Sequence, residues 1–198
     1  LASVLGRHGH EVHIADRVNR PVTNDPAVSQ AAGYHVVDIN NTDLLLATID
    51  ELRIECVVGL TSSLIPSSAL MHFEAELRLV ISPMFRLLEE LAKRQIGFVY
   101  LSSGGTVYGA NENDLVAETE SLRPINYYGY SKVLFEQYLA FAGQTLELRY
   151  LILRPSNPFG PHQNPNRKQG LIAVAVDKVL SGQPIEVWGD GSIVRDYI

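Results

Sequence analysis

The sequence predicts an α/β fold in which helices flank a doubly wound parallel sheet. Segments with helical periodicity alternate along the chain with short apolar runs, such as residues 56–60 and 98–101. Continuous apolar runs of this length are typical of strands buried on both faces of a parallel sheet. Small polar residues follow these two runs, and ligands of open α/β sheets bind beyond the carboxyl ends of strands. The fold class therefore also predicts where a binding site lies.

Composition and charge exclude several classes of protein and partner. A formal net charge of −6 argues against a surface for nucleic acid or anionic membrane, so we expect small molecules or proteins as partners. We find neither a membrane span nor a signal peptide, and the expected location is the cytoplasm. Cys56, the only cysteine, lies in an apolar run and is predicted to be a buried structural thiol. The spacing of His8, His10 and His13 fits no usual metal site, so no metal is expected.

The start of the chain reads as a helix end followed by two strands. Residues 1–8 are predicted to close a helix that Gly9 stops, and residues 11–15 to form a short strand. Asp16 ends that strand. In a dinucleotide fold, an acidic residue there accepts hydrogen bonds from the adenosine ribose and favours NAD over NADP. Residues 34–37 form the next predicted strand.

The middle of the chain is predicted to alternate helix and strand. Residues 43–52 have helical spacing and lead into the apolar strand 56–60. Thr61 follows this strand, at the edge of the sheet where a cofactor is expected. A wide apolar face marks a long helix over residues 68–94. Pro83 is expected to kink this helix, because proline removes one backbone hydrogen bond.

The next predicted strand, residues 98–101, ends in two hydroxyl side chains, Ser102 and Ser103. A helix is predicted over residues 127–142 and a further strand over residues 148–153.

Composition changes sharply after residue 154. Four prolines between positions 155 and 165 stiffen an irregular segment, which suits a crossing between domains. We therefore predict a first domain over residues 1–154 and the start of a second over residues 155–198. In the second, residues 171–180 read as an amphipathic helix, and residues 185–198 as a hairpin around a Gly-Asp-Gly-Ser loop.

Tyr128 and Lys132 are the residues most suggestive of catalysis. They are four positions apart in a predicted helix, which places both side chains on one face. Unit charges about 6 Å apart at an effective dielectric near 20 attract by about 3 kcal/mol. Such an attraction would lower the pKa of the phenol from about 10 to about 8, so that Tyr128 could act as a base.

These motifs together resemble the extended short-chain dehydrogenase/reductase family. The resemblance rests on the hydroxyl-rich strand end at Ser102 and Ser103, the Thr-Val-Tyr-Gly run that starts at Thr106, and Tyr128 with Lys132 at the start of a helix. Within the family, the chain is most similar to the NAD-dependent epimerases and dehydratases of nucleotide sugars, and among these to the 4-epimerases.

The resemblance implies a Rossmann-like NAD-binding domain that is incomplete at its start. The family has a strand and a Gly-x-x-Gly-x-x-Gly turn in front of the first helix seen here, and a longer substrate domain after residue 198. We therefore expect the sequence to be truncated at both ends. The family also forms homodimers through two helices, which correspond to residues 68–94 and 127–142.

The resemblance also assigns binding roles. The residues expected to bind NAD are Asp16, Asp38, Ile39, Thr61, Ser102, Tyr128, Lys132 and Pro155. In this set, Asp38 and Ile39 would touch the adenine, and Pro155 would abut the nicotinamide. The residues expected to bind the substrate are Asn157, Gln169 and Arg195. Arg195 would hold the diphosphate, because a guanidinium forks onto phosphate oxygens through two parallel hydrogen bonds.

One family residue is replaced in this chain. The hydroxyl that contacts the reacting sugar oxygen in the 4-epimerases falls at Gly104, which has no side chain. Thr106 is the predicted replacement, with Ser103 behind it, because a hydroxyl can relay a proton and orient the substrate. Sugar dehydratases have an Asp-Glu pair where this chain has Gly105 and Thr106, which argues against loss of water from the sugar.

The resemblance therefore implies an NAD-dependent epimerase that inverts C4 of a nucleotide sugar, with a UDP-hexose as the expected substrate and a 4-keto sugar as intermediate. Two alternatives stay open. One is a reductase or oxidoreductase that acts on a nucleotide-linked keto sugar with free NAD(P)H. The other is a dinucleotide-binding protein without catalytic activity, which the glycine at position 104 would suit.

Overall fold

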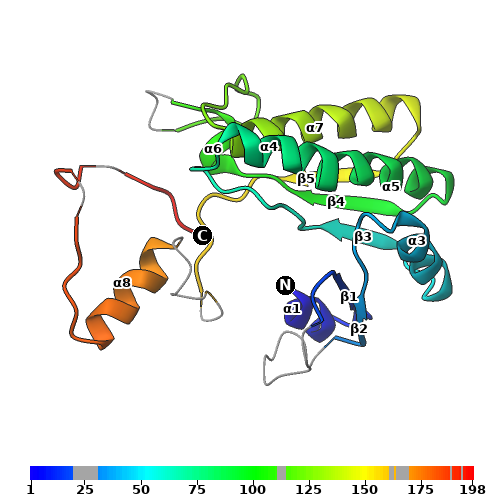
Figure 1. Ribbon diagram of the computed structural model, residues 1–198, viewed down its shortest axis with the longest axis horizontal. Helices are drawn as coiled ribbons and strands as arrows, with labels where there is room; N and C mark the ends of the chain where they lie inside the picture. The colour runs from blue at the N-terminus through cyan, green and yellow to red at the C-terminus, as the bar shows by residue number, and fades with distance from the viewer. Residues whose placement is uncertain (20–30, 111–114, 161–162, 164–169, 188, 193) are drawn as a thin grey trace.

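A computed structural model describes the chain except for residues 20–30, 111–114, 161–162, 164–169, 188 and 193. The described strands form two parallel sheets (Figure 1). The first pairs β1 (His13–Asp16) with β2 (Gly33–Val36); the second has the order β3 (Cys56–Gly59), β4 (Gly97–Leu101), β5 (Tyr150–Leu153). Parallel pairing throughout the described strands confirms the predicted α/β class.

Helices cover one face of the three-stranded sheet. The described helices are α1 (Ala2–Arg7), α3 (Thr42–Glu51), α4 (Leu70–Glu76), α5 (Ser82–Lys93), α6 (Gly104–Val107), α7 (Tyr127–Thr145) and α8 (Leu171–Leu180). Figure 1 shows α4, α5 and α7 lying side by side over β4 and β5. The core between these layers includes Leu88, Leu91, Phe98, Phe135 and Leu139, each at most 1% exposed. No helix of the described residues is long and apolar enough to cross a membrane.

The predicted helix over residues 68–94 is present and contains a π-helical turn. The turn, η1 (Leu77–Ile81), joins α4 to α5, and Pro83 stands at the start of α5. Proline has no N–H, so it cannot donate to the carbonyl of Leu79, four residues earlier. That carbonyl instead accepts a hydrogen bond from Asn40 Nδ2 at 3.0 Å. The irregularity that Pro83 predicts thus takes the form of a π turn stabilised from outside the helix.

The prediction that Cys56 is buried is wrong. Cys56 is exposed, as is Leu60 just beyond the end of β3. β3 lies at the edge of its sheet, and alternation along the strands turns Phe98 and Tyr100 of β4 into the core. Leu151 of β5 pairs with the residue between those two and is 53% exposed. An apolar run alone therefore does not distinguish burial on both faces from burial on one.

The two ends of the chain test two further predictions. The first helix ends where expected, and Gly9 adopts a left-handed φ of +86° after it. The hairpin predicted over residues 185–198 is wrong, because the described residues in this range form no strand pair with each other. Tyr197 instead forms a parallel bridge with Asn157, and the next hydrogen bond runs from Phe159 N to Ile198 O at 3.1 Å. An isolated hairpin is marginally stable in water, whereas this pairing ties the C-terminal residues to the segment after β5.

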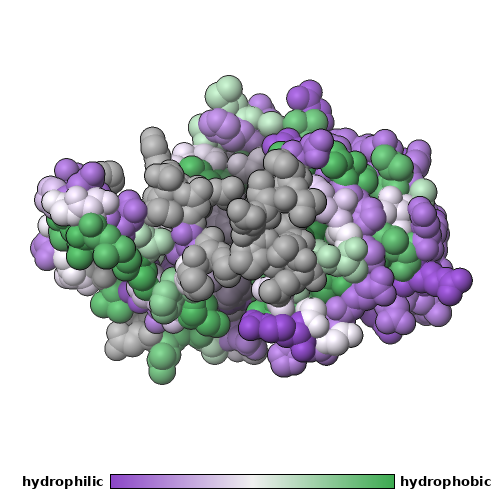
Figure 2. Space-filling view, turned by 90° about the horizontal axis from the view of Figure 1, so that it is seen from below, coloured by the Kyte–Doolittle hydropathy of each residue, from purple (hydrophilic) through white to green (hydrophobic). Residues whose placement is uncertain are grey.

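Helix α8 matches its predicted bounds, residues 171–180. Figure 1 shows α8 and the C-terminal segment away from the sheet layers. Leu171, Val176, Val179 and Leu180 stay more than half exposed, and Figure 2 shows hydrophobic residues at this end of the molecule. The division between domains after residue 154 stays a prediction.

Candidate active site

A cavity of about 270 Å³ lies where β3, β4 and β5 end. Ser102 and Ser103 after β4, Pro155 after β5, and Tyr128 and Lys132 of α7 all line it. These are five of the residues predicted to bind or catalyse. The carboxyl ends of parallel strands meet at one edge of a sheet, so the structure brings them together for the reason the sequence suggested.

Local sequence explains how α7 reaches this cavity. The side chain of Asn126 caps the helix by accepting a hydrogen bond from Gly129 N at 2.8 Å. Gly129 is needed because a Cβ there would lie 2.7 Å from the carbonyl oxygen of Thr106. The start of α7 therefore packs directly on α6, and its first two turns place Tyr128 and Lys132 at the strand ends.

Lys132 is buried and is held by the backbone of β4. Lys132 is 5% exposed, and its Nζ donates a hydrogen bond to Leu101 O at 2.9 Å. Nζ also lies 4.9 Å from the ring centroid of Tyr100 and 5.5 Å from that of Tyr128. Such distances permit attraction between an ammonium and the face of an aromatic ring.

Burial governs the charge state of Lys132. Removal from water lowers the pKa of its amine to about 8, and the carboxylates of Glu76 and Glu136 act in the opposite direction. Lys132 is thus a buried cation whose charge depends on nearby acidic residues.

The expectation that Lys132 makes Tyr128 acidic is not met in this structure. Burial raises the pKa of the Tyr128 phenol, and the Ser103 side chain opposes that rise through a hydrogen bond. The physical reason lies in the position of the ammonium, which lies by the ring of Tyr128 while it donates to Leu101 O. Spacing along a helix predicts that two side chains share a face, but it does not fix which atoms meet.

The predicted hydroxyl groups lie in different environments. Ser102 Oγ is buried and has no hydrogen-bond partner in the described part of the chain, although its residue lines the cavity. Thr106 Oγ1 is also buried without such a partner, and its residue lies on α6 outside the cavity lining. A Cβ at Gly104 would lie 2.8 Å from the carbonyl oxygen of Arg154, so the backbone leaves no room for a side chain there.

Arg154 is a residue near the site that the sequence reasoning did not single out. Its guanidinium forms an ion pair with Glu136, in which Nη2 and Oε2 are 2.6 Å apart. It also donates to Tyr108 Oη at 2.7 Å and to Glu118 O at 2.9 Å. These bonds anchor the backbone just before Pro155. The signal available in the sequence was a glutamate one helical turn after Lys132 and an arginine at the end of the last strand.

The residues predicted to bind the adenosine lie at the ends of β1 and β2. The Asp16 side chain accepts a hydrogen bond from Val18 N at 3.1 Å, and the Asp16 carbonyl accepts one from Val37 N at 3.0 Å. Asp38 accepts hydrogen bonds from Asn40, which lower the pKa of its carboxyl. Ile39 is partly buried and packs against the core.

Thr61, predicted to bind the cofactor, and the residues predicted to bind the substrate are less closely gathered. Thr61 is exposed, beside Ser62 of the cavity lining. Asn157 uses its side-chain amide to donate to Asp196 O at 2.9 Å. Arg195 is exposed and donates to Val194 O at 3.0 Å, outside the cavity lining. Gln169 lies outside the described residues.

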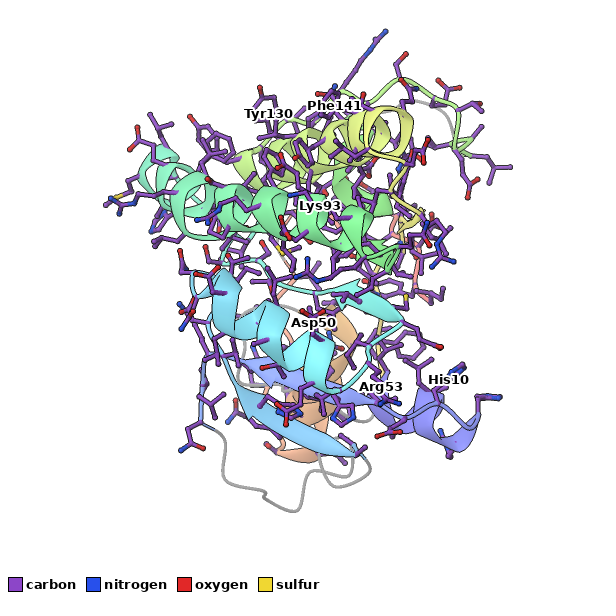
Figure 3. The ribbon with its side chains drawn as sticks, turned by 90° about the vertical axis from the view of Figure 1, so that its right-hand side faces the viewer. His10, Asp50, Arg53, Lys93, Tyr130 and Phe141 are labelled. Carbon is purple, nitrogen blue, oxygen red and sulfur yellow. The ribbon has the colours of Figure 1, made fainter. Side chains whose placement is uncertain are left out.

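A larger hollow of about 510 Å³ lies between α3 and α5 and includes none of the predicted site residues. Of the two arginines that line it, Arg94 is already paired with Asp50 at 3.0 Å and with Glu90 at 2.6 Å. Figure 3 shows Asp50 on α3, on the side of the molecule that carries Lys93 of α5. In the described residues, no three histidine, cysteine or acidic side chains gather as a metal site would require.

Known proteins resemble this chain in sequence and in fold. The chain is 40% identical over 100 residues to a dTDP-4-dehydro-6-deoxyglucose reductase of Escherichia coli, which is 50% of this chain and 31% of that protein. The crystal structure of a UDP-glucose 4-epimerase from Thermotoga maritima, with UDP-glucose, superposes with a TM-score of 0.87 at 27% identity, over 98% of this chain and 63% of the other. A UDP-glucose 4-epimerase from Thermus thermophilus, in complex with NAD, gives a TM-score of 0.85 at 26% identity, over 98% and 64%.

The chain thus spans less than two thirds of the length of each of these relatives. Its agreement with both solved structures confirms the Rossmann-like fold. The family whose sequence pattern matches all of residues 1–198 is described as the NAD dependent epimerase/dehydratase family, which also agrees with the predicted cofactor. The chain therefore belongs to the NAD-dependent epimerase/dehydratase family.

Proposed function

We propose that this chain is part of an NAD-dependent nucleotide-sugar epimerase that inverts C4 of a UDP-hexose through a 4-keto intermediate. The observation that carries the proposal is the shared cavity of Tyr128, Lys132, Ser102 and Ser103 at the strand ends. Two solved relatives are UDP-glucose 4-epimerases, one with UDP-glucose and one with NAD. A location in the cytoplasm belongs to the same proposal.

In the proposed reaction, Tyr128 takes the proton of the sugar 4-hydroxyl while the hydride of C4 leaves. NAD, when bound, would supply the hydride acceptor and, in its reduced form, the hydride donor. Tyr128 then returns the proton to the oxygen as hydride reaches the opposite face of the keto sugar. Burial raises the pKa of Tyr128 and the Ser103 side chain only opposes that rise, so the ionised phenol would need the positive charge of bound NAD in addition to that of Lys132.

The remaining residues of the cavity would bind and orient. Lys132 would bind the nicotinamide ribose, and Pro155 would pack against the nicotinamide. Ser103 lies beside the phenol and would relay its proton. Thr106, the first candidate from the sequence, lies outside the cavity lining and becomes the second. The buried Ser102 Oγ, which has no partner in the described residues, fits a polar group of the cofactor.

The outer parts of both ligands are assigned to residues beyond the cavity. Asp16, Asp38, Ile39 and Thr61 would contact the adenosine part of NAD, with Asp16 favouring NAD over NADP. The residues proposed for the nucleotide-sugar diphosphate and its base are Asn157, Gln169 and Arg195.

We also propose a homodimer through residues 68–94 and 127–142. Leu79, Tyr130 and Phe141 of these helices are 44%, 52% and 51% exposed, and Figure 3 shows Tyr130 and Phe141 along the outer side of the helix layer. Exposed apolar residues on neighbouring helices are typical of interfaces. A Phe141→Glu variant should run as a monomer in light scattering; an unchanged oligomeric state in this variant would contradict the assignment.

The reaction type can be tested with the full-length protein, UDP-glucose and catalytic NAD. An epimerase converts UDP-glucose into its C4 epimer, UDP-galactose, and consumes no cofactor overall. The assay therefore follows sugar composition by chromatography and NADH by absorbance at once. Interconversion without net NADH change supports the proposal, and no interconversion of any UDP-hexose contradicts it.

A reductase is the second candidate, and one observation favours it. The Escherichia coli relative with 40% identity is a reductase of a dTDP-linked keto sugar. Stoichiometric oxidation of NAD(P)H with a nucleotide-linked 4-keto sugar would select this function. Binding of NAD without turnover of any sugar would select a protein that only binds the dinucleotide.

A further inference from the structure

Glu76 is a buried acid that the proposed reaction leaves without a role. It is the last residue of α4, and only 2% of its surface is exposed. Its Oε2 accepts hydrogen bonds from Ser63 N at 2.9 Å and from Ser63 Oγ at 2.5 Å. Both donors are neutral, so these bonds orient the carboxylate and leave its charge uncompensated.

The partner of Glu76 belongs to the segment that closes the candidate active site. Ser62 and Leu64 line the cavity after β3, and Ser63 stands between them. Ser63 donates to Glu76 through both its backbone and its hydroxyl, which fixes the segment at its middle residue. Two hydrogen bonds to one carboxylate are charge-assisted and stronger than bonds between neutral groups. The position of this side of the cavity therefore depends on Glu76.

The negative charge of Glu76 also acts on the amine of Lys132. The titratable groups that act on or lie against the Lys132 amine are Glu76 from α4, Glu136 and Tyr128 from α7, and Tyr100 from β4. Both carboxylates raise the pKa of Lys132, and Glu76 does so more strongly. Burial raises the pKa of Tyr100, and the charges of Glu136 and Glu76 add to that rise.

The two acids differ in what neutralises them. Glu136 is bound by the guanidinium of Arg154 through three contacts of 2.6 to 3.2 Å. Hydrogen bonds to Glu76 come, within the described residues, from Ser63 alone. Glu136 is therefore paired with a cation, whereas the described partners of Glu76 are neutral donors.

We propose that Glu76 is a positioning residue of the candidate active site, one that anchors the segment from Ser62 to Leu64 and provides the negative charge that keeps buried Lys132 an ammonium ion. The expected effect on turnover rests on the proposed function, because the proposed reaction needs a charged Lys132. Its structural part, the link between Glu76, Ser63 and Lys132, can be measured without any sugar.

The experiment uses full-length protein and three variants. Glu76→Gln removes the charge and keeps an oxygen that can accept from Ser63. Ser63→Ala keeps the charge and loses one hydrogen bond. Glu74→Gln, at an exposed position of the same helix, is the control for loss of one negative charge. The titration of Lys132 is followed by NMR of the carbon next to its amine, with the signal assigned from a Lys132→Arg variant.

We expect Glu76→Gln to lower the pKa of Lys132 below its parent value of about 8, with Ser63→Ala and Glu74→Gln leaving it unchanged. The alkaline limb of the turnover profile should move by the same amount. Ser63→Ala should instead weaken NAD binding roughly fivefold, as expected for one lost hydrogen bond. A Lys132 titration that Glu76→Gln leaves in place would overturn the inference.

Two further outcomes separate the possible failures. If the parent protein turns over no sugar but Glu76→Gln still shifts the Lys132 titration, the proposed function fails and the positioning role stands. If Glu76→Gln does not fold, the carboxyl carbon of Glu76 is observed in the parent protein at pH 7. The signal of an ionised carboxylate supports the inference, and that of a protonated acid overturns it.

Discussion

The ion pair of Glu136 and Arg154 should stabilise the fold and the entry to the substrate region together. The side chains are 4% and 21% exposed, and their closest atoms are 2.6 Å apart. Glu136→Gln keeps the shape and an acceptor oxygen but leaves the guanidinium with no opposite charge in contact. Loss of one partner of a buried ion pair costs about 3–5 kcal/mol. Since glutamine can still accept one hydrogen bond, we expect a loss of about 3 kcal/mol in the free energy of unfolding.

Urea unfolding of the parent and the variant measures this difference. The control is Glu74→Gln, an exposed change of the same charge, which should stay within about 0.5 kcal/mol of the parent. A double variant, Glu136→Gln with Arg154→Met, should lose less than the sum of the two single variants, by about 1–3 kcal/mol. A Glu136→Gln variant as stable as the control would refute the reasoning, and so would a double variant whose losses simply add.

Three further predictions concern the site. Gly104→Ser should lower the free energy of unfolding by about 1–3 kcal/mol and should not raise turnover, because its Cβ would lie 2.8 Å from Arg154 O. Gly105→Ser, whose Cβ would have its nearest neighbour at 4.0 Å, is the matched control in thermal unfolding and turnover assays. Turnover should fall as pH rises through about 8, where Lys132 loses its proton. Between pH values of about 8 and the unfolded pKa near 10.4, the free energy of unfolding should rise with pH, because the unfolded chain still binds the proton that folded Lys132 has lost. A turnover rate that stays the same up to pH 9.5 would contradict the charge assignment. Asp16→Ser should reduce the preference for NAD over NADP in a binding titration, and an unchanged ratio of the two affinities would remove Asp16 from the cofactor site.

Regular elements with strong periodicity were predictable, because local pattern and tertiary packing agree there. Helix α8 has its predicted bounds, and α7 begins at the predicted Tyr127 and runs to Thr145. Features that depend on distant contacts were not predictable. The π turn needs Asn40 to bind the Leu79 carbonyl, and the pairing of Tyr197 with Asn157 joins residues forty positions apart.

The candidate site shows the same division. That Tyr128, Lys132 and the two serines meet follows from strand-end geometry and helical spacing, both of which the sequence reveals. Their protonation does not follow, because it depends on burial and on atoms from other elements. Neither Glu76 nor Arg154 could be assigned from spacing, since each acts through a partner on another element, Ser63 for the first and Glu136 for the second.

The central claim is that Tyr128 transfers the proton of the sugar hydroxyl. The most direct measurement is the single-turnover rate of UDP-hexose oxidation by the full-length protein and its Tyr128→Phe variant, both saturated with NAD. Loss of a general base usually costs a factor of about 10² to 10⁴, so we expect the variant to be slower by at least about a hundredfold while NAD still binds. A variant within about tenfold of the parent rate would contradict the account.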